Sequence, residues 1–248
     1  MPGDYSLQPL GNGYFVKVSP VHRFNTDTII LADFSMPKKH EIALDIGTGC
    51  GTIPLIWCRE NSAKHITAVD IQPDACELFR ESIRLNKLEN KIDVVNSDIN
   101  LLHGEGYSGC YDLVVCNPPY KPEGTGYVNP DKGKMTARHE SDLKLDDILM
   151  CAKDLLRFGG RFCLCLRPER LCDIITAFRN ADIEPKKLRL VQQREDKAPK
   201  LMLIEGKRGA QKGGLIVMPT LFIEDETGDF SREMKKIYGI YKYNDSHK

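Results

Sequence analysis

Short apolar runs rich in β-branched residues alternate with segments of helical period from residue 42 to residue 205. An alternation of this kind is typical of a parallel sheet built from βαβ units. The pattern predicts seven such strands, at Ile42–Ile46, Ile66–Ile71, Ile92–Asn96, Tyr111–Cys116, Arg161–Leu166, Leu188–Val191 and Leu201–Glu205. We therefore expect an α/β fold with a doubly wound sheet.

Helices are expected between these strands. Three prolines, Pro54, Pro73 and Pro168, stand where a helix can begin, because proline is tolerated in a first helical turn. The clearest helical stripe has apolar residues three and four positions apart, at Leu145, Ile148, Leu149, Ala152, Leu155 and Leu156. Gly159 and Gly160 follow this stripe, and we expect them to end the helix.

The segments on either side of this core have weaker patterns. Before it, Tyr14–Val18 is expected to be a strand and Thr26–Phe34 a short helix. After it, the expected elements are two strands and one helix, at Leu215–Met218, Leu221–Ile223 and Phe230–Tyr238.

Length and composition fit one large domain. The 248 residues are 41% hydrophobic, which is enough to fill a core. No internal repeat and no linker rich in Pro, Gly or Ser divides the chain. We expect a single domain over 1–248, with an N-terminal extension (1–41), a core (42–206) and a C-terminal decoration (207–248).

The balance of charges and the cysteines limit which binding partners and which cell compartment we expect. The 35 Lys and Arg residues balance 35 Asp and Glu residues, so binding to nucleic acid would need a local basic patch. The nine cysteines are odd in number and include no C-x-x-C pair, which favours a reduced, cytoplasmic chain. The sequence has no export leader, no apolar run of membrane-spanning length and no metal-ligand spacing of histidines. We expect no membrane, no metal and, with the oligomeric state otherwise open, a monomer.

A glycine-rich loop follows the first core strand. Gly47, Gly49 and Gly51 alternate with Thr48 and Cys50 directly after that strand. Glycines in this position let the backbone approach a nucleoside cofactor. The spacing differs from the Gly-x-Gly-x-x-Gly of a pyrophosphate cradle, so a cofactor without a diphosphate is favoured over NAD.

Three carboxylates stand near the ends of successive strands. Asp45 precedes the loop, Asp70 follows 25 residues later, and Asp98 comes after the third strand. Asp70 is placed to accept hydrogen bonds from both ribose hydroxyls, and Asp98 to accept one from an adenine amino group. A tight turn with solvated acids is the alternative for any one of these features.

Together these motifs resemble those of class I S-adenosylmethionine-dependent methyltransferases. The resemblance implies a Rossmann-like fold whose mostly parallel sheet has seven strands, the seventh of them antiparallel. It implies S-adenosylmethionine as the cofactor, bound by Asp45, Gly47, Thr48, Gly49, Gly51, Asp70, Ile71, Asp98, Ile99 and Asn117.

The sequence Asn117-Pro118-Pro119-Tyr120 follows the strand at Tyr111–Cys116. The Asn117 side-chain oxygen and the Pro118 carbonyl can accept the two protons of an exocyclic amino group, and the two prolines fix the backbone that presents them. Tyr120 would stack on the base. We expect these four residues to carry methyl transfer to a planar, weakly nucleophilic nitrogen, although the motif alone is compatible with a simple chain turn.

Two further segments are candidates for substrate contact. Residues 121–139 lack a periodic pattern, and we expect this stretch to close over the base or to be a solvated loop. Its candidate contacts are Lys121, Tyr127, Lys132, Lys134, Arg138 and His139. Residues 186–212 hold nine basic residues against three acids, which is compatible with a phosphate-binding surface, beginning with Lys186, Lys187 and Arg189, or with a solvated face.

The whole chain is similar to the bacterial tRNA(Val) adenine-N6 methyltransferase family, which modifies the adenine beside the anticodon. The matching segments are His22–Ala32, Asp45–Gly51, Asn117–Tyr120, Ala137–Glu140, Arg167–Arg170 and Asp229–Arg232. The resemblance implies that Thr26 and Asp27 lie beside the cofactor and that tRNA is the partner.

Relatives that share the Asn-Pro-Pro-Tyr motif remain alternatives. They act on ribosomal RNA bases, on DNA adenine or on a release-factor glutamine. The last carries a helical domain before the core, and DNA enzymes typically add a large recognition region, whereas few residues flank the core here. A non-catalytic S-adenosylmethionine-binding regulator is disfavoured because Asn117 and Tyr120 are present.

Overall fold

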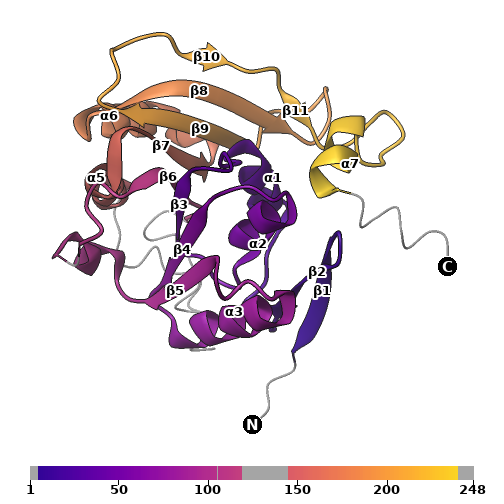
Figure 1. The fold of residues 1–248 in the computed structure, drawn as a ribbon. Helices are drawn as coiled ribbons and strands as arrows, with labels where there is room; N and C mark the ends of the chain where they lie inside the picture. Colours follow the sequence, from indigo (N-terminus) through magenta and orange to yellow (C-terminus); the bar gives the residue numbers. More distant parts are fainter. Residues whose placement is uncertain (1–4, 105, 119–144, 240–248) are drawn as a thin grey trace, which may run out of the picture.

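A twisted β-sheet forms the centre of the computed structural model, which describes residues 5–104, 106–118 and 145–239 (Figure 1). The strand order across the sheet is β10-β8-β9-β7-β6-β3-β4-β5. The seven long strands are β3 (Ile42–Ile46), β4 (His65–Asp70), β5 (Ile92–Asn96), β6 (Tyr111–Cys116), β7 (Leu156–Leu166), β8 (Ile183–Gln192) and β9 (Leu201–Arg208).

Among these seven strands, β9 alone runs against its neighbours. It pairs antiparallel with β7 and with β8, whereas β3, β4, β5, β6 and β7 pair in parallel. The expected sheet with an antiparallel seventh strand is therefore confirmed. Its size is corrected from seven strands to nine, because the short strands β10 (Ile216–Val217) and β11 (Leu221–Phe222) pair in parallel with β8.

The order of strands reverses between β3 and β6. From β3 the chain proceeds outward through β4 and β5, and it then returns to place β6 on the other side of β3. Ile46 of β3 is in register with Cys116 of β6, so the residues that follow these two strands are neighbours. Open α/β sheets bind ligands at such a reversal, outside the carboxyl ends of the strands.

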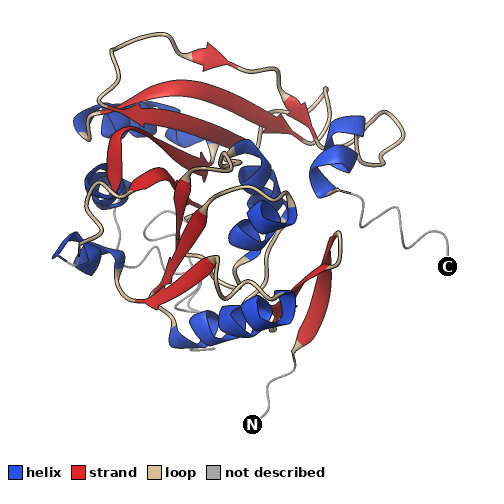
Figure 2. Ribbon diagram, in the orientation of Figure 1, coloured by secondary structure: helices blue, strands red, loops and turns tan. Residues whose placement is uncertain are grey.

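Helices cover both faces of the sheet (Figure 2). One face carries α1 (Thr26–Phe34), α2 (Thr52–Arg59) and α3 (Pro73–Asn86); the other carries α5 (Leu145–Leu155), α6 (Leu171–Asn180) and the 3₁₀ turns η1 (Ile99–Gly104) and η2 (Pro168–Arg170). Alternate strand residues supply the two cores: Leu113 and Val115 pack on the first side and Val114 on the second. Trp57 is buried in the first core and donates a 3.1 Å hydrogen bond to the Ala32 carbonyl.

The first hairpin and the last helix that the structure describes pack on the α1–α2–α3 side. The hairpin of β1 (Ser6–Gly11) and β2 (Tyr14–Val18) lies along α3, where the Ser82 hydroxyl accepts the Lys17 backbone N–H at 2.9 Å. The C-terminal helix α7 (Arg232–Tyr238) lies against α1. The sequence did not predict β1, because this segment contains a proline and is exposed over most of its length.

The prediction that Gly159 and Gly160 end α5 is wrong. The helix ends at Leu155, and both glycines lie within β7. A Cβ on Gly160 would lie 3.0 Å from the Tyr111 carbonyl oxygen, so the glycine permits β7 to pass close to β6. The pairing of β6 with β7 is irregular at this place, between Tyr111 and Leu113.

Candidate active site

The glycine loop after β3 is built to leave its backbone open. Gly47, Gly49 and Gly51 have φ values of +69°, +56° and +81°, a left-handed conformation that glycine adopts without steric cost. The backbone N–H groups of Gly47 and Thr48 both donate to the Val69 carbonyl, at 2.8 and 3.0 Å, and tie the loop to β4. A Cβ on Gly47 or Gly49 would meet nothing within 4 Å. The loop therefore borders a space that a flat ligand can enter.

Asp70, at the end of β4, holds the same loop in place through a hydrogen bond to its carboxylate. Its Oδ2 atom accepts the Gly49 backbone N–H at 2.7 Å, and its Oδ1 atom accepts the Gln72 N–H at 2.9 Å. Each carboxylate oxygen can accept a second hydrogen bond, so Asp70 can still bind the hydroxyls of a ribose. The next side chain, Ile71, lies outside β4 and is exposed, which leaves an apolar surface beside the carboxylate.

Asp98 and Ile99 lie at the start of η1, after β5. The Asp98 carboxylate is half-buried and accepts the Asn100 backbone N–H at 2.9 Å. Ile99 is buried. Because β3, β4 and β5 are consecutive neighbours in the sheet, the three expected carboxylates lie along one edge.

Asp45 is a buried carboxyl group with an unused acceptor. Its Oδ2 atom and the Thr48 Oγ1 atom are both buried, and neither has a hydrogen-bond partner among the described residues. Burial raises the pKa of Asp45 to about 7; the adjacent Thr48 side chain opposes this shift, and the charge of Asp70 adds to it. Buried polar atoms are normally paired, so these two atoms beside the open glycine loop fit a ligand with polar groups.

Asn117 leaves the end of β6 next to this loop and is held by helix α1. Its Nδ2 atom donates a 3.1 Å hydrogen bond to the Thr28 hydroxyl oxygen. Thr28 in turn lies 3.0 Å from the side-chain oxygen of Asn25, the N-cap of α1. Sequence analysis missed Thr28 and Asn25, although the Asn-x-x-Thr spacing at a helix start is a capping signal.

Thr26 and Asp27 occupy the first turn of the same helix. Both are half-buried, and the Thr26 hydroxyl is 2.9 Å from the phenolic oxygen of Tyr238 in α7. The start of α1 therefore lies between Asn117 and the C-terminal helix. Pro118 is half-buried, and the remaining predicted contacts lie outside the described residues: Pro119, Tyr120, Lys121, Tyr127, Lys132, Lys134, Arg138 and His139.

The basic segment 186–212 does not form one surface. β8 and β9 are antiparallel, so Lys200, before β9, lies at the carboxyl edge of the sheet, whereas Lys207, near the end of β9, lies at the amino edge. Seven strand residues span about 23 Å. Only the first of these two lysines shares an edge with Asn117.

Three predicted substrate contacts in that segment have internal partners. Lys186 Nζ donates to the Gln211 carbonyl at 2.7 Å, and Lys187 pairs with Glu205 at 3.0 Å. Arg189 is buried and donates to both carboxylate oxygens of Glu233, at 2.8 and 2.7 Å. The expectation that Arg189 contacts substrate is corrected, because its guanidinium would have to abandon a bidentate pair to reach a phosphate.

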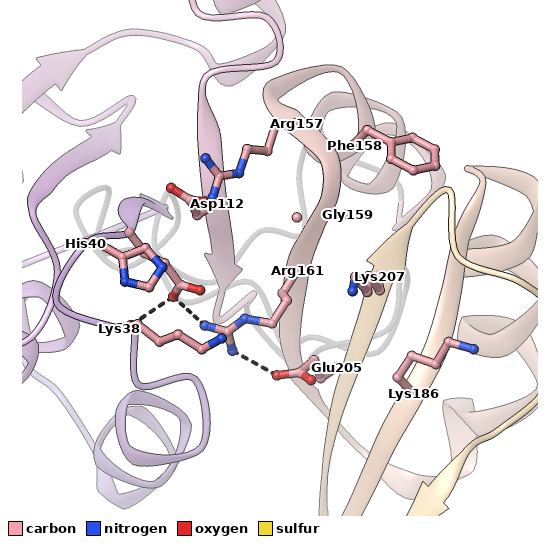
Figure 3. A pocket seen from close by; sticks show the side chains of 12 residues that line it. Lys38, His40, Asp112, Arg157, Phe158, Gly159, Arg161, Lys186, Glu205 and Lys207 are labelled. Atoms are coloured by element: carbon pink, nitrogen blue, oxygen red, sulfur yellow. Dashed lines mark hydrogen bonds and ion pairs between the residues drawn. The ribbon is translucent and has the colours of Figure 1, made fainter.

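A charged pocket of about 360 Å³ opens at the amino ends of β3, β6 and β7 (Figure 3). Arg161 lies within it and bridges Glu41 at 2.7 Å and Glu205 at 2.9 Å. Arg157 pairs with Asp112 on the same side. The opposed charges make this pocket a salt-bridge network at the edge away from Asn117.

Two further features bear on the expected partners. In the described part of the chain, no three His, Cys, Asp or Glu side chains are grouped so that they could hold a metal ion. None of the helices described has both the length and the apolar composition needed to cross a membrane.

Comparison with known proteins gives consistent matches. The family model of the TRM5/TYW2 methyltransferase domain matches residues 31–124. A tRNA1(Val) (adenine(37)-N6)-methyltransferase of Parabacteroides distasonis is 31% identical over 184 residues, which cover 74% of this chain and 76% of that protein. The protein of the same name from Aliivibrio fischeri is 29% identical over 73% of this chain and 75% of its own length.

Solved structures share the fold. A predicted O-methyltransferase of Agrobacterium tumefaciens superposes with a TM-score of 0.67 at 19% identity, over 86% of this chain and 95% of that one. The tRNA m1G37 methyltransferase of M. jannaschii gives a TM-score of 0.59 at 19% identity, over 85% of this chain and 59% of that one.

Proposed function

Because this chain belongs to the tRNA1(Val) (adenine(37)-N6)-methyltransferase family, it is an S-adenosylmethionine-dependent methyltransferase, and we propose that it methylates N6 of the anticodon-loop adenine of tRNA(Val). The proposal takes residues 1–248 as one catalytic domain that acts as a monomer, since one chain supplies every side chain described in the site. A tRNA substrate implies a cytoplasmic enzyme.

The position of Asn117 carries the proposal. It follows β6 at the reversal of strand order, beside the loop that follows β3, and its amide nitrogen is hydrogen-bonded to Thr28. The amide oxygen is then the atom of this side chain that can accept a hydrogen bond from a substrate amine. A hydrogen-bond acceptor next to an open glycine loop is the arrangement that amino-group methylation needs.

The residues along the carboxyl edge fit S-adenosylmethionine. Asp70 and Asp98 would hold its ribose and adenine, with Ile71 and Ile99 beside them. Gly47 and Gly49 would allow the backbone to approach it, whereas Gly51, also expected at the cofactor, faces the Phe79 ring. The buried polar atoms of Asp45 and Thr48 would bind its polar groups. Thr26 and Asp27 are proposed as neighbours of the same ligand. When bound, the cofactor supplies a methyl group on a positively charged sulfur.

The chain's own contribution is positioning. Asn117 Oδ1 and the Pro118 carbonyl would accept the two protons of the adenine amino group and hold its lone pair in line, while Tyr120 would stack on the base. Pro119 would restrict the backbone between Pro118 and Tyr120. Well-oriented reactants can recover roughly 7–11 kcal/mol of a barrier, so no general base is required and the released proton can pass to water.

The test is a methylation assay that identifies the product. The purified chain is incubated with labelled S-adenosylmethionine and an unmodified tRNA(Val) transcript, and the digested nucleosides are separated. N6-methyladenosine is expected from the transcript with adenine at position 37, and none from a matched transcript with guanine there. Ribosomal RNA, duplex DNA and a release factor serve as competing substrates, and preferential methylation of any of these would overturn the proposal.

The same pair of transcripts addresses a second candidate, methylation of guanine. The TRM5/TYW2 family model matches the segment that contains the glycine loop and Asn117, and the M. jannaschii protein that shares the fold is a tRNA m1G37 methyltransferase, which acts on guanine. Methylation of the guanine-37 transcript alone would assign the chain to guanine chemistry.

A further inference from the structure

We propose that Thr28 and Asn25 are positioning residues that determine the orientation of the Asn117 amide, that is, the directions in which its oxygen and its nitrogen point. The inference rests on the proposed function, in which the Asn117 oxygen accepts a proton of the substrate amine. It concerns a chain of hydrogen bonds that joins the cap of helix α1 to the end of strand β6.

The direction of the first bond is certain. The Thr28 backbone N–H donates to Asn25 Oδ1 at 3.0 Å. A backbone N–H can only donate, so the Asn25 atom at this place is the carbonyl oxygen of its amide. The N-cap contact thus fixes the orientation of the Asn25 side chain.

The second bond follows from the first. The Thr28 hydroxyl oxygen lies 3.0 Å from the same Asn25 oxygen. That oxygen has no proton to donate, so the single hydroxyl proton of Thr28 must point toward it. The Thr28 oxygen then offers only lone pairs to any other neighbour.

The third bond fixes the Asn117 amide. The amide atom that faces Thr28 at 3.1 Å must be a donor, which is Nδ2. Turning the amide by half a rotation would place its oxygen against the Thr28 lone pairs, with two acceptors about 3 Å apart and no proton between them. The Asn117 oxygen is therefore held on the side away from α1.

This orientation has a chemical consequence. An amide that presented its NH₂ group to the substrate would repel the amine protons instead of accepting them. Helix α1 thus acts on the reaction through Asn117 without touching the reacting atoms. A merely structural role for Thr28, by contrast, would affect folding or cofactor affinity and leave the rate of the bound complex unchanged.

The test compares two substitutions of Thr28, one that removes its hydroxyl group and one that keeps it. Thr28→Val keeps the branched shape of the side chain and removes the hydroxyl, and Thr28→Ser keeps the hydroxyl. Thr176→Val is the matched control, since the Thr176 hydroxyl on exposed α6 bonds only its own helix, to the Cys172 carbonyl at 2.9 Å. We measure kcat on tRNA at saturating cofactor, the Kd of S-adenosylhomocysteine by calorimetry, and the melting temperature.

For Thr28→Val we expect kcat to fall about tenfold, the fold-change of one lost hydrogen bond, with Kd and melting temperature like those of the control. Thr28→Ser should recover most of the rate. An unchanged kcat in Thr28→Val would overturn the proposal. So would a fall in kcat that is accompanied by weaker binding of S-adenosylhomocysteine or by a lower melting temperature.

A second measurement needs no substrate. The side-chain amide protons of Asn117 are followed by ¹⁵N NMR in the protein alone. We expect slow hydrogen exchange at one of them in the wild-type chain and in Thr28→Ser, and fast exchange in Thr28→Val. Equal exchange in all three would overturn the positioning role. If the wild-type chain fails to methylate tRNA, the proposed function falls, while this measurement still decides the orientation of the amide.

Discussion

Asp70 accepts a 2.7 Å hydrogen bond from the backbone N–H of Gly49, so the end of one strand holds the loop that follows its neighbour. The carboxylate shapes the glycine loop, and in the proposed function it also binds the cofactor ribose. Under that proposal, loop geometry and cofactor affinity would be coupled through this one side chain.

Replacing this carboxylate should weaken cofactor binding before it affects anything else. For Asp70→Ala we expect a loss of about 10- to 100-fold in affinity for S-adenosylhomocysteine, the size of one charge-assisted hydrogen bond. Calorimetric titration measures it, with Asp93→Asn on exposed β5 as a control acid. Unchanged affinity in Asp70→Ala would remove the ribose role.

The glycine loop offers a contrast between two neighbouring positions. A Cβ at Gly51 would lie 2.0 Å from the Phe79 ring, whereas a Cβ at Gly49 meets nothing within 4 Å. Gly51→Ala should lower the free energy of unfolding by about 1–3 kcal/mol from overpacking, in addition to about 1–2 kcal/mol for a left-handed alanine. Gly49→Ala should lower the free energy of unfolding only by the amount for a left-handed alanine, and it should also weaken cofactor binding. Urea unfolding and calorimetry separate the two, and equal stability of both variants would contradict the packing of Gly51 on Phe79.

The raised pKa of Asp45 predicts a pH-dependent stability. The native carboxyl keeps its proton up to a pKa of about 7, whereas an unfolded Asp loses it near its ordinary value of about 3.9. Between these values the native state binds more protons than the unfolded state, so this group's contribution to stability falls as pH rises from about 4 to about 7. Asp45→Asn does not titrate. Urea unfolding is measured for both proteins at several pH values in this window. The free energy of unfolding of the wild type should fall relative to that of Asp45→Asn as pH rises. A difference between the two proteins that does not change with pH would contradict a buried, protonated Asp45.

The Asn117 amide should matter to the rate and little to cofactor binding. For Asn117→Ala we expect kcat to fall about 10²- to 10³-fold, as when one preorganised polar group is removed from an active site. S-adenosylhomocysteine affinity should stay close to that of the wild type. Single-turnover methylation of tRNA gives the rate, and wild-type turnover in this variant would show that the motif is only structural.

The division of the basic segment predicts which lysine meets tRNA. Lys200 shares the carboxyl edge with Asn117, whereas Lys212 follows the far end of β9. Both are exposed, and neither forms an ion pair within the described ranges. Lys200→Gln should weaken tRNA binding and reduce the slope of log Kd against log salt by about one, and Lys212→Gln should change neither. A larger effect at Lys212 would mean that the RNA crosses the amino edge.

The sequence predicted the bounds of three parallel strands, β3, β5 and β6, better than those of β8. The bounds of β3, β5 and β6 agree residue by residue, because each is a short apolar run bounded by turn residues. β8 extends over Ile183–Gln192 instead of four residues, since Glu184, Pro185, Lys186 and Lys187 interrupt its apolar residues and hide the strand in the sequence. The prediction for Gly159 and Gly160 was wrong because a pair of glycines is compatible both with the end of a helix and with the close approach of two strands.

The candidate site was predictable only where its residues are adjacent in the chain. The glycine loop, Asp70 and Asn117 follow strand ends and could be assigned from their order. Thr28 could not be linked to Asn117, because the bond joins residues 89 positions apart. The balance of charges in 186–212 likewise gave no sign that the turn of the β8–β9 hairpin lies at the carboxyl edge of the sheet and both its ends at the amino edge.

The two short strands β10 and β11 have a consequence for behaviour in concentrated solution. Without them, ten-residue β8 would end the sheet with a row of unpaired backbone groups. Such a row recruits strands from neighbouring molecules. By pairing at Lys187, Leu188, Val191 and Gln192, the C-terminal segment shields this border and so guards the enzyme against aggregation.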